Sequence, residues 1–111
     1  MAIHSLGKIS TASTTTGAQV SATHYNCQSF SVQAISTNTG VIYVCDTATP
    51  NLTTWVGVLW EIPAPSASTA IGSRPGVTFE NNASPGCFDM QNIYILPSVG
   101  NEGARVTVVV S

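Results

Sequence analysis

The chain has 111 residues, of which three are lysine or arginine and five are aspartate or glutamate, whereas 43% are hydrophobic. An ordinary soluble domain carries about a quarter charged residues, so this chain has few groups for acid–base chemistry and a surface suited to protein contact. The composition favours a protein that assembles with partners over an enzyme.

The charge distribution and the hydropathy argue against two classes of partner. Lys8, Arg74 and Arg105 stand singly, whereas binding to phosphates needs clustered cations. No apolar run approaches the roughly 20 residues that cross a bilayer, and residues 1–8 lack the features of a signal peptide. We therefore expect a protein made in the cytoplasm that binds neither nucleic acid nor membrane.

The length of the chain suits one domain with one core. The Ser/Thr-rich run from Ser10 to Gly17 can bury little surface, so we expect a flexible or surface-laid arm over residues 1–17. The domain then occupies residues 18–111, and Ala18–Ala22 predicts a weak first strand.

The next segments predict a β-hairpin. Apolar and polar residues alternate over residues 30–36, which is the pattern of a strand with one buried face. The expected buried residues are Phe30, Val32 and Ala34. A turn signal at residues 38–40 precedes the β-branched and aromatic run Val41–Cys45, and the two strands are expected to pair with each other.

A further strand is predicted at Thr54–Ile62, after a turn at Pro50 and Asn51. Side chains alternate across a strand, so one face carries Trp55, Gly57, Leu59 and Glu61, and the other carries Val56, Val58, Trp60 and Ile62. The second face is more apolar, and we expect it to face the core.

The rest of the chain predicts a long irregular segment and a second hairpin. Prolines and glycines between residues 63 and 76 precede a short strand at Val77–Glu80. Asn92–Leu96, a turn at Pro97–Gly103 and Ala104–Val110 then predict a closing hairpin.

Short strands without helices between them predict an all-β fold, an antiparallel β-sandwich of jelly-roll type. Residues 106–110 are apolar except for Thr107, which indicates a strand covered on both faces. In a domain this small, one of the two faces of this strand is expected to be covered by another subunit. The sequence therefore favours a homo-oligomer.

The residues that carry chemistry form no recognisable catalytic or metal-binding motif. Cys27, Cys45 and Cys87 are expected to be reduced and buried, with one disulfide such as Cys27–Cys45 left open. His4 or His24 with Cys27 does not complete a tetrahedral metal site, and no nucleophile, calcium or phosphate-binding motif is present. We expect no catalytic residues, no cofactor and no metal. Isolated carboxylates beside turns favour solvated or hydrogen-bonding roles; these are Asp46, Glu61, Glu80, Asp89 and Glu102.

Three aromatic residues are the clearest candidates for a contact surface. These residues are Tyr43, Trp55 and Trp60. They could form a platform that binds sugars, part of a protein interface, or ordinary packing. We favour the interface because Trp and Tyr are common interface anchors. With the valine-rich end included, the candidate interface residues are Trp55, Tyr43, Val108 and Val110.

Two segments, Thr39–Asp46 and Met90–Val108, resemble small all-β virion proteins of tailed bacteriophages. Such proteins have an Asn-Thr-Gly-x-Ile-Tyr-Val-Gly strand and a closing Asn-x-Ile-Tyr-Val unit, followed by a turn and a valine-rich strand. Cys45 stands where that pattern has glycine, and Pro63–Pro85 resembles an insertion.

The resemblance implies a capsid decoration, or cement, protein. Such a protein stabilises the phage head from the outer surface of the shell, is often a homotrimer, and has the major capsid protein and its own copies as partners. Low charge fits this role, because it avoids repulsion among closely packed copies. The alternatives are a neck, tail or fibre component and a carbohydrate-binding adhesion module.

Overall fold

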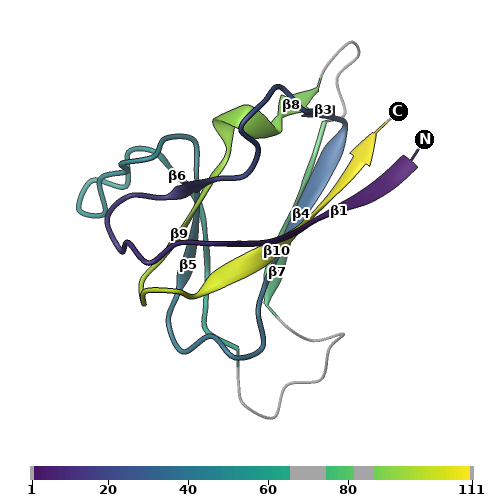
Figure 1. Cartoon of the computed structure of the whole chain (residues 1–111). Coiled ribbons are helices and arrows are strands. Elements are labelled where there is room, and N and C mark those ends of the chain that lie inside the picture. The colour runs from purple at the N-terminus through teal and green to yellow at the C-terminus, as the bar shows by residue number, and fades with distance from the viewer. Residues whose placement is uncertain (1, 66–74, 82–86, 111) are drawn as a thin grey trace.

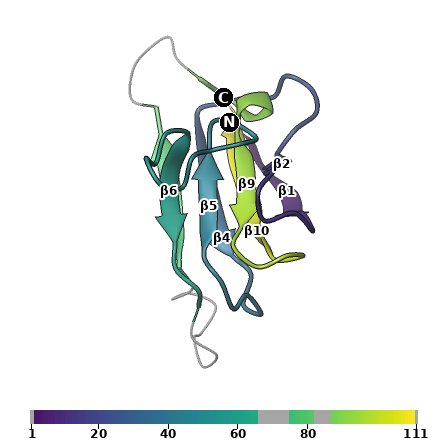
Figure 2. The same cartoon turned by 90° about the vertical axis from the view of Figure 1, so that its left-hand side faces the viewer.

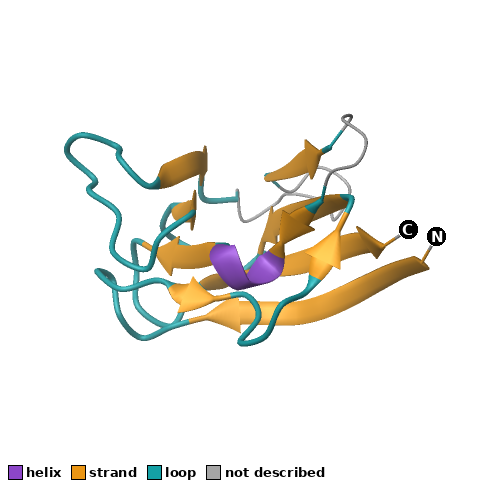
Figure 3. Ribbon diagram, turned by 90° about the horizontal axis from the view of Figure 1, so that it is seen from above, coloured by secondary structure: helices purple, strands orange, loops and turns teal. Residues whose placement is uncertain are grey.

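The structure is a computed structural model, and it describes residues 2–65, 75–81 and 87–110. Two antiparallel sheets of four strands face each other (Figure 1). The helical element η2 is a single 3-10 turn at Met90–Asn92, and it lies beside the strands when the molecule is seen from above (Figure 3). The expected all-β, antiparallel sandwich is therefore confirmed.

The first sheet contains both ends of the chain. Its strands, in spatial order, are β1 (Ala2–Ser10), β10 (Gly103–Val110), β4 (Ser29–Ala34) and β7 (Gly76–Glu80). Ala2 pairs with Val110, so the two termini lie side by side (Figure 1).

The second sheet covers the opposite side of the core. Its strands, in spatial order, are β2 (Ala18–Gln19), β9 (Tyr94–Pro97), β5 (Ile42–Cys45) and β6 (Val58–Ile62). Figure 2 shows this sheet facing the viewer, with β6 at its edge. A short pair, β3 (Asn26–Cys27) and β8 (Phe88–Asp89), lies outside both sheets.

The core lies between the sheets and follows the alternation of the strands. In β4, Phe30, Val32 and Ala34 are buried as expected. Phe30 stacks on Phe79 of β7 with ring centroids 4.8 Å apart, and it meets the edge of Phe88 at 5.2 Å. Aromatic pairs in these geometries contribute beyond the area that they bury.

Both expected hairpins are wrong, although their strands are present. β4 and β5 belong to different sheets, and so do β9 and β10. β5 pairs with β6 and β9, whereas β10 pairs with β1 and β4. Of the eight strands in the two sheets, only β5 and β6 are consecutive and share a sheet. At these turns the chain reverses its direction, but it passes from one sheet to the facing sheet instead of pairing with the strand before the turn. This order is compatible with the jelly roll, which stays a prediction.

The expected arm at residues 1–17 is a strand over most of its length. β1 pairs with β10 from Ala2 to Ser10, with a bulge between Ser5 and Gly7. Leu6 and Ile9 pack against the core. Burial of these two apolar side chains stabilises the strand, whereas the Ser/Thr-rich run at residues 10–17 has no large apolar side chain to bury. Residues 2–10 are therefore part of the sandwich.

The valine-rich strand is buried on one face only. Val106 and Val108 lie in the core, Arg105 is exposed, and Thr107 and Val109 are half-buried on the outer face. The inner face of β10 is covered by the second sheet, so the valine run gives no reason of its own to expect a second subunit.

The strand expected at Thr54–Ile62 is shorter, and both tryptophans of the segment are exposed. Trp55 and Gly57 have φ of 64° and 91°, which places them in the left-handed region and prevents a strand before Val58. Ile62 is buried, but Trp60 is 51% exposed because β6 is an edge strand. The expected inward position of Trp60 is wrong.

Two other expectations fall on the outer parts of the fold. The strand predicted at Val77–Glu80 is confirmed as β7, whereas most of the irregular segment at residues 63–76, including Arg74, lies outside the described residues.

No helix long and apolar enough to span a membrane occurs in the part of the chain that the structure describes.

Candidate contact surface

The loop between β5 and β6 has a fixed backbone conformation. The Asn51 side-chain oxygen accepts hydrogen bonds from the backbone N–H groups of Thr53 and Thr54 at 2.8 and 3.0 Å. The backbone N–H of Asn51 donates to Val56 O at 2.9 Å. These bonds form a local turn of the kind that Asn favours, and they hold the backbone of residues 51–56.

The conformation of this loop also depends on Gly57. A Cβ atom at Gly57 would lie 2.5 Å from the Thr47 side chain, and the φ of 91° is rarely adopted by residues with a side chain. The N–H of Asp46 donates to Gly57 O at 3.0 Å, which connects the two ends of the loop. The sequence around Gly57 therefore folds into a tight, closed loop.

This loop and β6 expose a concentrated set of apolar side chains. They are Leu52, Trp55, Val56, Leu59 and Trp60, and we call them the 52–60 surface. Val56 is 70% exposed. Elsewhere in the described residues, the large exposed hydrophobic side chains are Ile3 and Val99. Leu59 and Trp60 are adjacent in β6, so their side chains project from opposite faces of that strand. Exposed large apolar side chains in this number commonly mark a contact site.

Two of the sequence-predicted interface residues meet beside this surface. The rings of Tyr43 on β5 and Trp55 have centroids 6.1 Å apart and are tilted by 48°. Tyr43 also lies directly opposite Glu61 on β6. Burial, and then the negative charge of Glu61, raise the pKa of the Tyr43 hydroxyl above its usual value. Tyr43 therefore remains neutral, and its ring packs beside that of Trp55.

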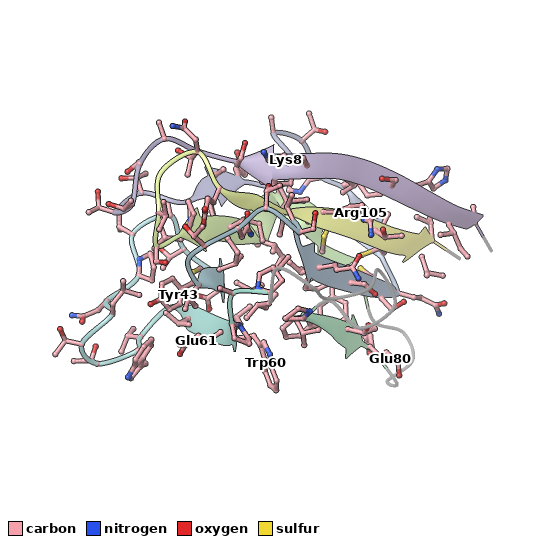
Figure 4. The ribbon with its side chains drawn as sticks, turned by 90° about the horizontal axis from the view of Figure 1, so that it is seen from below. Lys8, Tyr43, Trp60, Glu61, Glu80 and Arg105 are labelled. Carbon is pink, nitrogen blue, oxygen red and sulfur yellow. The ribbon has the colours of Figure 1, made fainter. Side chains whose placement is uncertain are left out.

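The other two predicted interface residues lie elsewhere. Val108 is fully buried in the core, and Val110 is half-buried and packs against the core at the end of β10. Neither belongs to the 52–60 surface. Figure 4 shows Tyr43, Glu61 and Trp60 on the strands of the second sheet, away from Lys8 and Arg105 on the first.

Sequence reasoning missed Leu52, Val56 and Trp60 as surface residues, whereas it placed Leu59 on the outward face. The assumption of an uninterrupted strand from Thr54 to Ile62 placed Val56 and Trp60 in the core. Gly57 was a usable signal, because a glycine within a strand pattern often marks a bulge or a turn. β6 indeed contains an irregularity opposite Val44 and Cys45.

Polar side chains of the described residues form hydrogen bonds with the backbone, and Asp89 is an example. Asp89 accepts hydrogen bonds from the N–H groups of Tyr25 and Gln91, each at 3.0 Å, and its other oxygen lies 2.5 Å from His24 Nδ1. No group of three or more potential metal ligands occurs among the residues that the structure describes.

The three cysteines are free and occupy different environments. Burial raises the pKa of the Cys27 thiol to about 11 and that of Cys45 to about 12, with smaller contributions from nearby negative groups. Cys87 is exposed, contrary to the expectation that all three are buried. The thiolate is the reactive form, so the two buried cysteines act as small apolar side chains.

Comparison with protein-family models, with curated proteins and with solved structures finds no match to this chain.

Proposed function

We propose that this chain is a virion structural protein that decorates the outer surface of a phage capsid shell. The 52–60 surface is the part that contacts the major capsid protein. The observation that carries the proposal is the concentration of five exposed apolar side chains within nine residues of a chain with only eight charged residues, three basic and five acidic.

The chemistry of this surface suits a protein partner. Trp side chains are enriched among the residues that contribute most to binding at interfaces, and here Trp55 and Trp60 are both exposed. Asn51 and Gly57 fix the loop that carries Trp55, so little conformational entropy is lost when the surface is covered. An apolar surface held in advance in this way supports association.

The low charge of the chain supports a role at high copy number. Many copies on one shell lie close together, and each added charge would increase the repulsion between neighbours. A shell also presents many identical sites, so association of the decorating copies as a homotrimer would raise the avidity of modest contacts. Trimer formation is part of the proposal, as is the jelly-roll order of the two sheets, an arrangement found in viral capsid proteins and lectins.

The experiment is co-sedimentation of the purified protein with empty capsid shells assembled from the cognate major capsid protein. We expect saturable binding at a copy number that matches the symmetry of the shell, together with greater survival of the shells on heating. Absence of binding would contradict the proposal, and it would direct attention to tail assemblies and to host glycans.

A further inference from the structure

The outer face of the first sheet carries polar residues in two aligned rows. One row crosses all four strands and consists only of hydroxyl residues: Ser5, Thr107, Ser31 and Thr78. The next row consists of Lys8, Arg105, Gln33 and Gly76. Neighbouring strands lie about 4.8 Å apart, so each row extends over about 14 Å.

All residues of these rows except Lys8 line an open groove of about 540 Å³. Side chains from both rows line it, and Gly76 adds no side chain at the β7 end. The Ser31 and Thr78 hydroxyls lie 2.9 Å apart. Arg105 Nη2 donates a hydrogen bond to Gln33 Oε1. The groove is therefore a connected polar surface on the face of a sheet.

One residue of the lining, Arg105, has a second cation as its neighbour, Lys8, which lies outside the lining. Lys8 and Arg105 are directly opposite each other on β1 and β10 (Figure 4). Like charges in this position destabilise a sheet. Glu102 interacts electrostatically with Lys8, but its carboxylate oxygens accept hydrogen bonds from Thr39 and Gly40. A bound anion between Lys8 and Arg105 would relieve their repulsion.

The chemistry of the lining indicates the class of ligand. Hydroxyl groups both donate and accept hydrogen bonds, and so do the hydroxyl groups of sugars. An extended peptide binds by adding a strand to an unpaired sheet edge. The floor of this groove is instead the face of strands that are already paired, so it does not suit a peptide strand. The described lining residues include no aromatic ring, so recognition relies on hydrogen bonds and charge.

We propose that this groove binds an acidic saccharide. Its carboxylate lies against Arg105, on the side of the groove next to Lys8, and its hydroxyl groups bond to the row from Ser5 to Thr78. Arg has five N–H donors in a planar fork, which suits a carboxylate. Glu80 lies on the same face at the β7 end, opposite Ser29 in the row beyond the hydroxyls. Its negative charge favours a single orientation, with the carboxylate at the β1 end.

This groove is separate from the 52–60 surface, which belongs to the second sheet and its loop. Saccharide binding by the isolated protein therefore neither requires nor excludes attachment to a shell. A protein that uses both surfaces would hold the shell through one sheet and present the groove of the other.

The test is isothermal titration calorimetry of the full chain with 3′-sialyllactose and a hyaluronan tetrasaccharide, which carry carboxylates, and with lactose as the neutral probe. We expect saturable binding of at least one acidic probe and binding of lactose that is at least about tenfold weaker, because the neutral sugar lacks the charge-assisted hydrogen bonds.

Three variants assign the binding to the groove. Arg105→Gln should weaken binding of the acidic probe at least about tenfold, and Thr107→Val should weaken it severalfold. Thr54→Val removes a hydroxyl from the exposed loop of the second sheet and should leave binding unchanged. Arg105 is exposed, so Arg105→Gln should retain the fold, which circular dichroism checks. The proposal is overturned if neither acidic probe binds saturably at millimolar concentration, if lactose binds equally well, or if Arg105→Gln has no effect.

Discussion

Glu102 accepts a hydrogen bond from the backbone N–H of Gly40 at 2.9 Å and so joins two of the connections by which the chain crosses between the sheets, β4–β5 and β9–β10. The other carboxylate oxygen accepts from the N–H and the hydroxyl of Thr39, at 2.8 and 2.9 Å. Beside it, Asn38 is buried, and its Nδ2 donates to Gly103 O at 2.7 Å. These bonds fix the end of the sandwich where β4 leads to β5 and β9 leads to β10.

Replacing Glu102 with Ala should therefore destabilise the domain. The variant leaves the N–H groups of Thr39 and Gly40 without their carboxylate acceptor, and we expect a loss of about 1–2 kcal/mol in the free energy of unfolding. Chemical denaturation measures it. Glu61→Ala removes a carboxylate from an exposed edge position and should change stability by less than about 0.5 kcal/mol. Equal effects of the two variants would contradict the role of Glu102.

Asp89 makes stability depend on acidity below about pH 4. The hydrogen bond from His24, followed by those from the N–H groups of Tyr25 and Gln91, lowers the pKa of Asp89 from 3.8 to about 2. Burial alone would raise the pKa of Glu102, but the hydrogen bonds from Thr39 and Gly40 hold it below its usual value.

A carboxyl group with a lowered folded-state pKa stabilises the fold above its unfolded-state pKa, and this contribution is lost as the pH falls toward the folded-state value. For Asp89 this window runs from about pH 4 down to about pH 2. Thermal unfolding of the wild type and of Asp89→Asn between pH 2 and 5 measures the effect. The midpoints of the two proteins should differ at pH 5 and converge toward pH 2, and a constant difference would refute the assignment.

The three thiols should react at very different rates. Cys87 is exposed, whereas burial raises the pKa of Cys27 to about 11 and that of Cys45 to about 12. At pH 8, a chromogenic thiol reagent should label one cysteine rapidly in the native protein and all three after unfolding. Cys87→Ser should abolish the rapid phase, and Cys45→Ser should leave it unchanged. Rapid labelling of two or more thiols in the native wild type would show that the buried cysteines are accessible.

The N-terminal strand should contribute to stability. Leu6 and Ile9 are half-buried against the core, so Leu6→Ala combined with Ile9→Ala should lower the free energy of unfolding by about 2–4 kcal/mol. Ile3 on the same strand is 71% exposed, and Ile3→Ser is the matched control with little effect. Unchanged stability of the double variant would mean that residues 2–10 behave as a dispensable arm.

The sequence predicts the strands better than their partners. Alternation in residues 30–36 identifies the buried face of β4 correctly, because that pattern depends only on local geometry. Turn signals at residues 38–40 and 97–103 predict a reversal of direction, but a reversal within one sheet and a crossing to the facing sheet use similar residues. The bonds that select the crossing join Glu102 to Thr39 and Gly40, which are far apart from it in sequence.

The contact surface is predictable only in part for the same reason. Trp55 and Tyr43 are typical interface residues, and the structure brings them together. The exposure of Trp60 depends on the edge position of β6, and that of Val56 on the positive φ of its neighbours Trp55 and Gly57. The groove on the first sheet depends on register across four strands, which no local pattern contains.

The measurement that tests the central claim most directly is a saturation binding curve on empty shells for three proteins. They are the wild type, the double variant Trp55→Ser with Trp60→Ser, and Ile3→Ser, which removes an exposed apolar side chain on the other sheet. If the 52–60 surface holds the shell, the double variant should bind at least about a hundredfold more weakly, since each lost Trp anchor costs 2 kcal/mol or more. Ile3→Ser should bind as the wild type does. Equal binding of the double variant and the wild type would contradict the account.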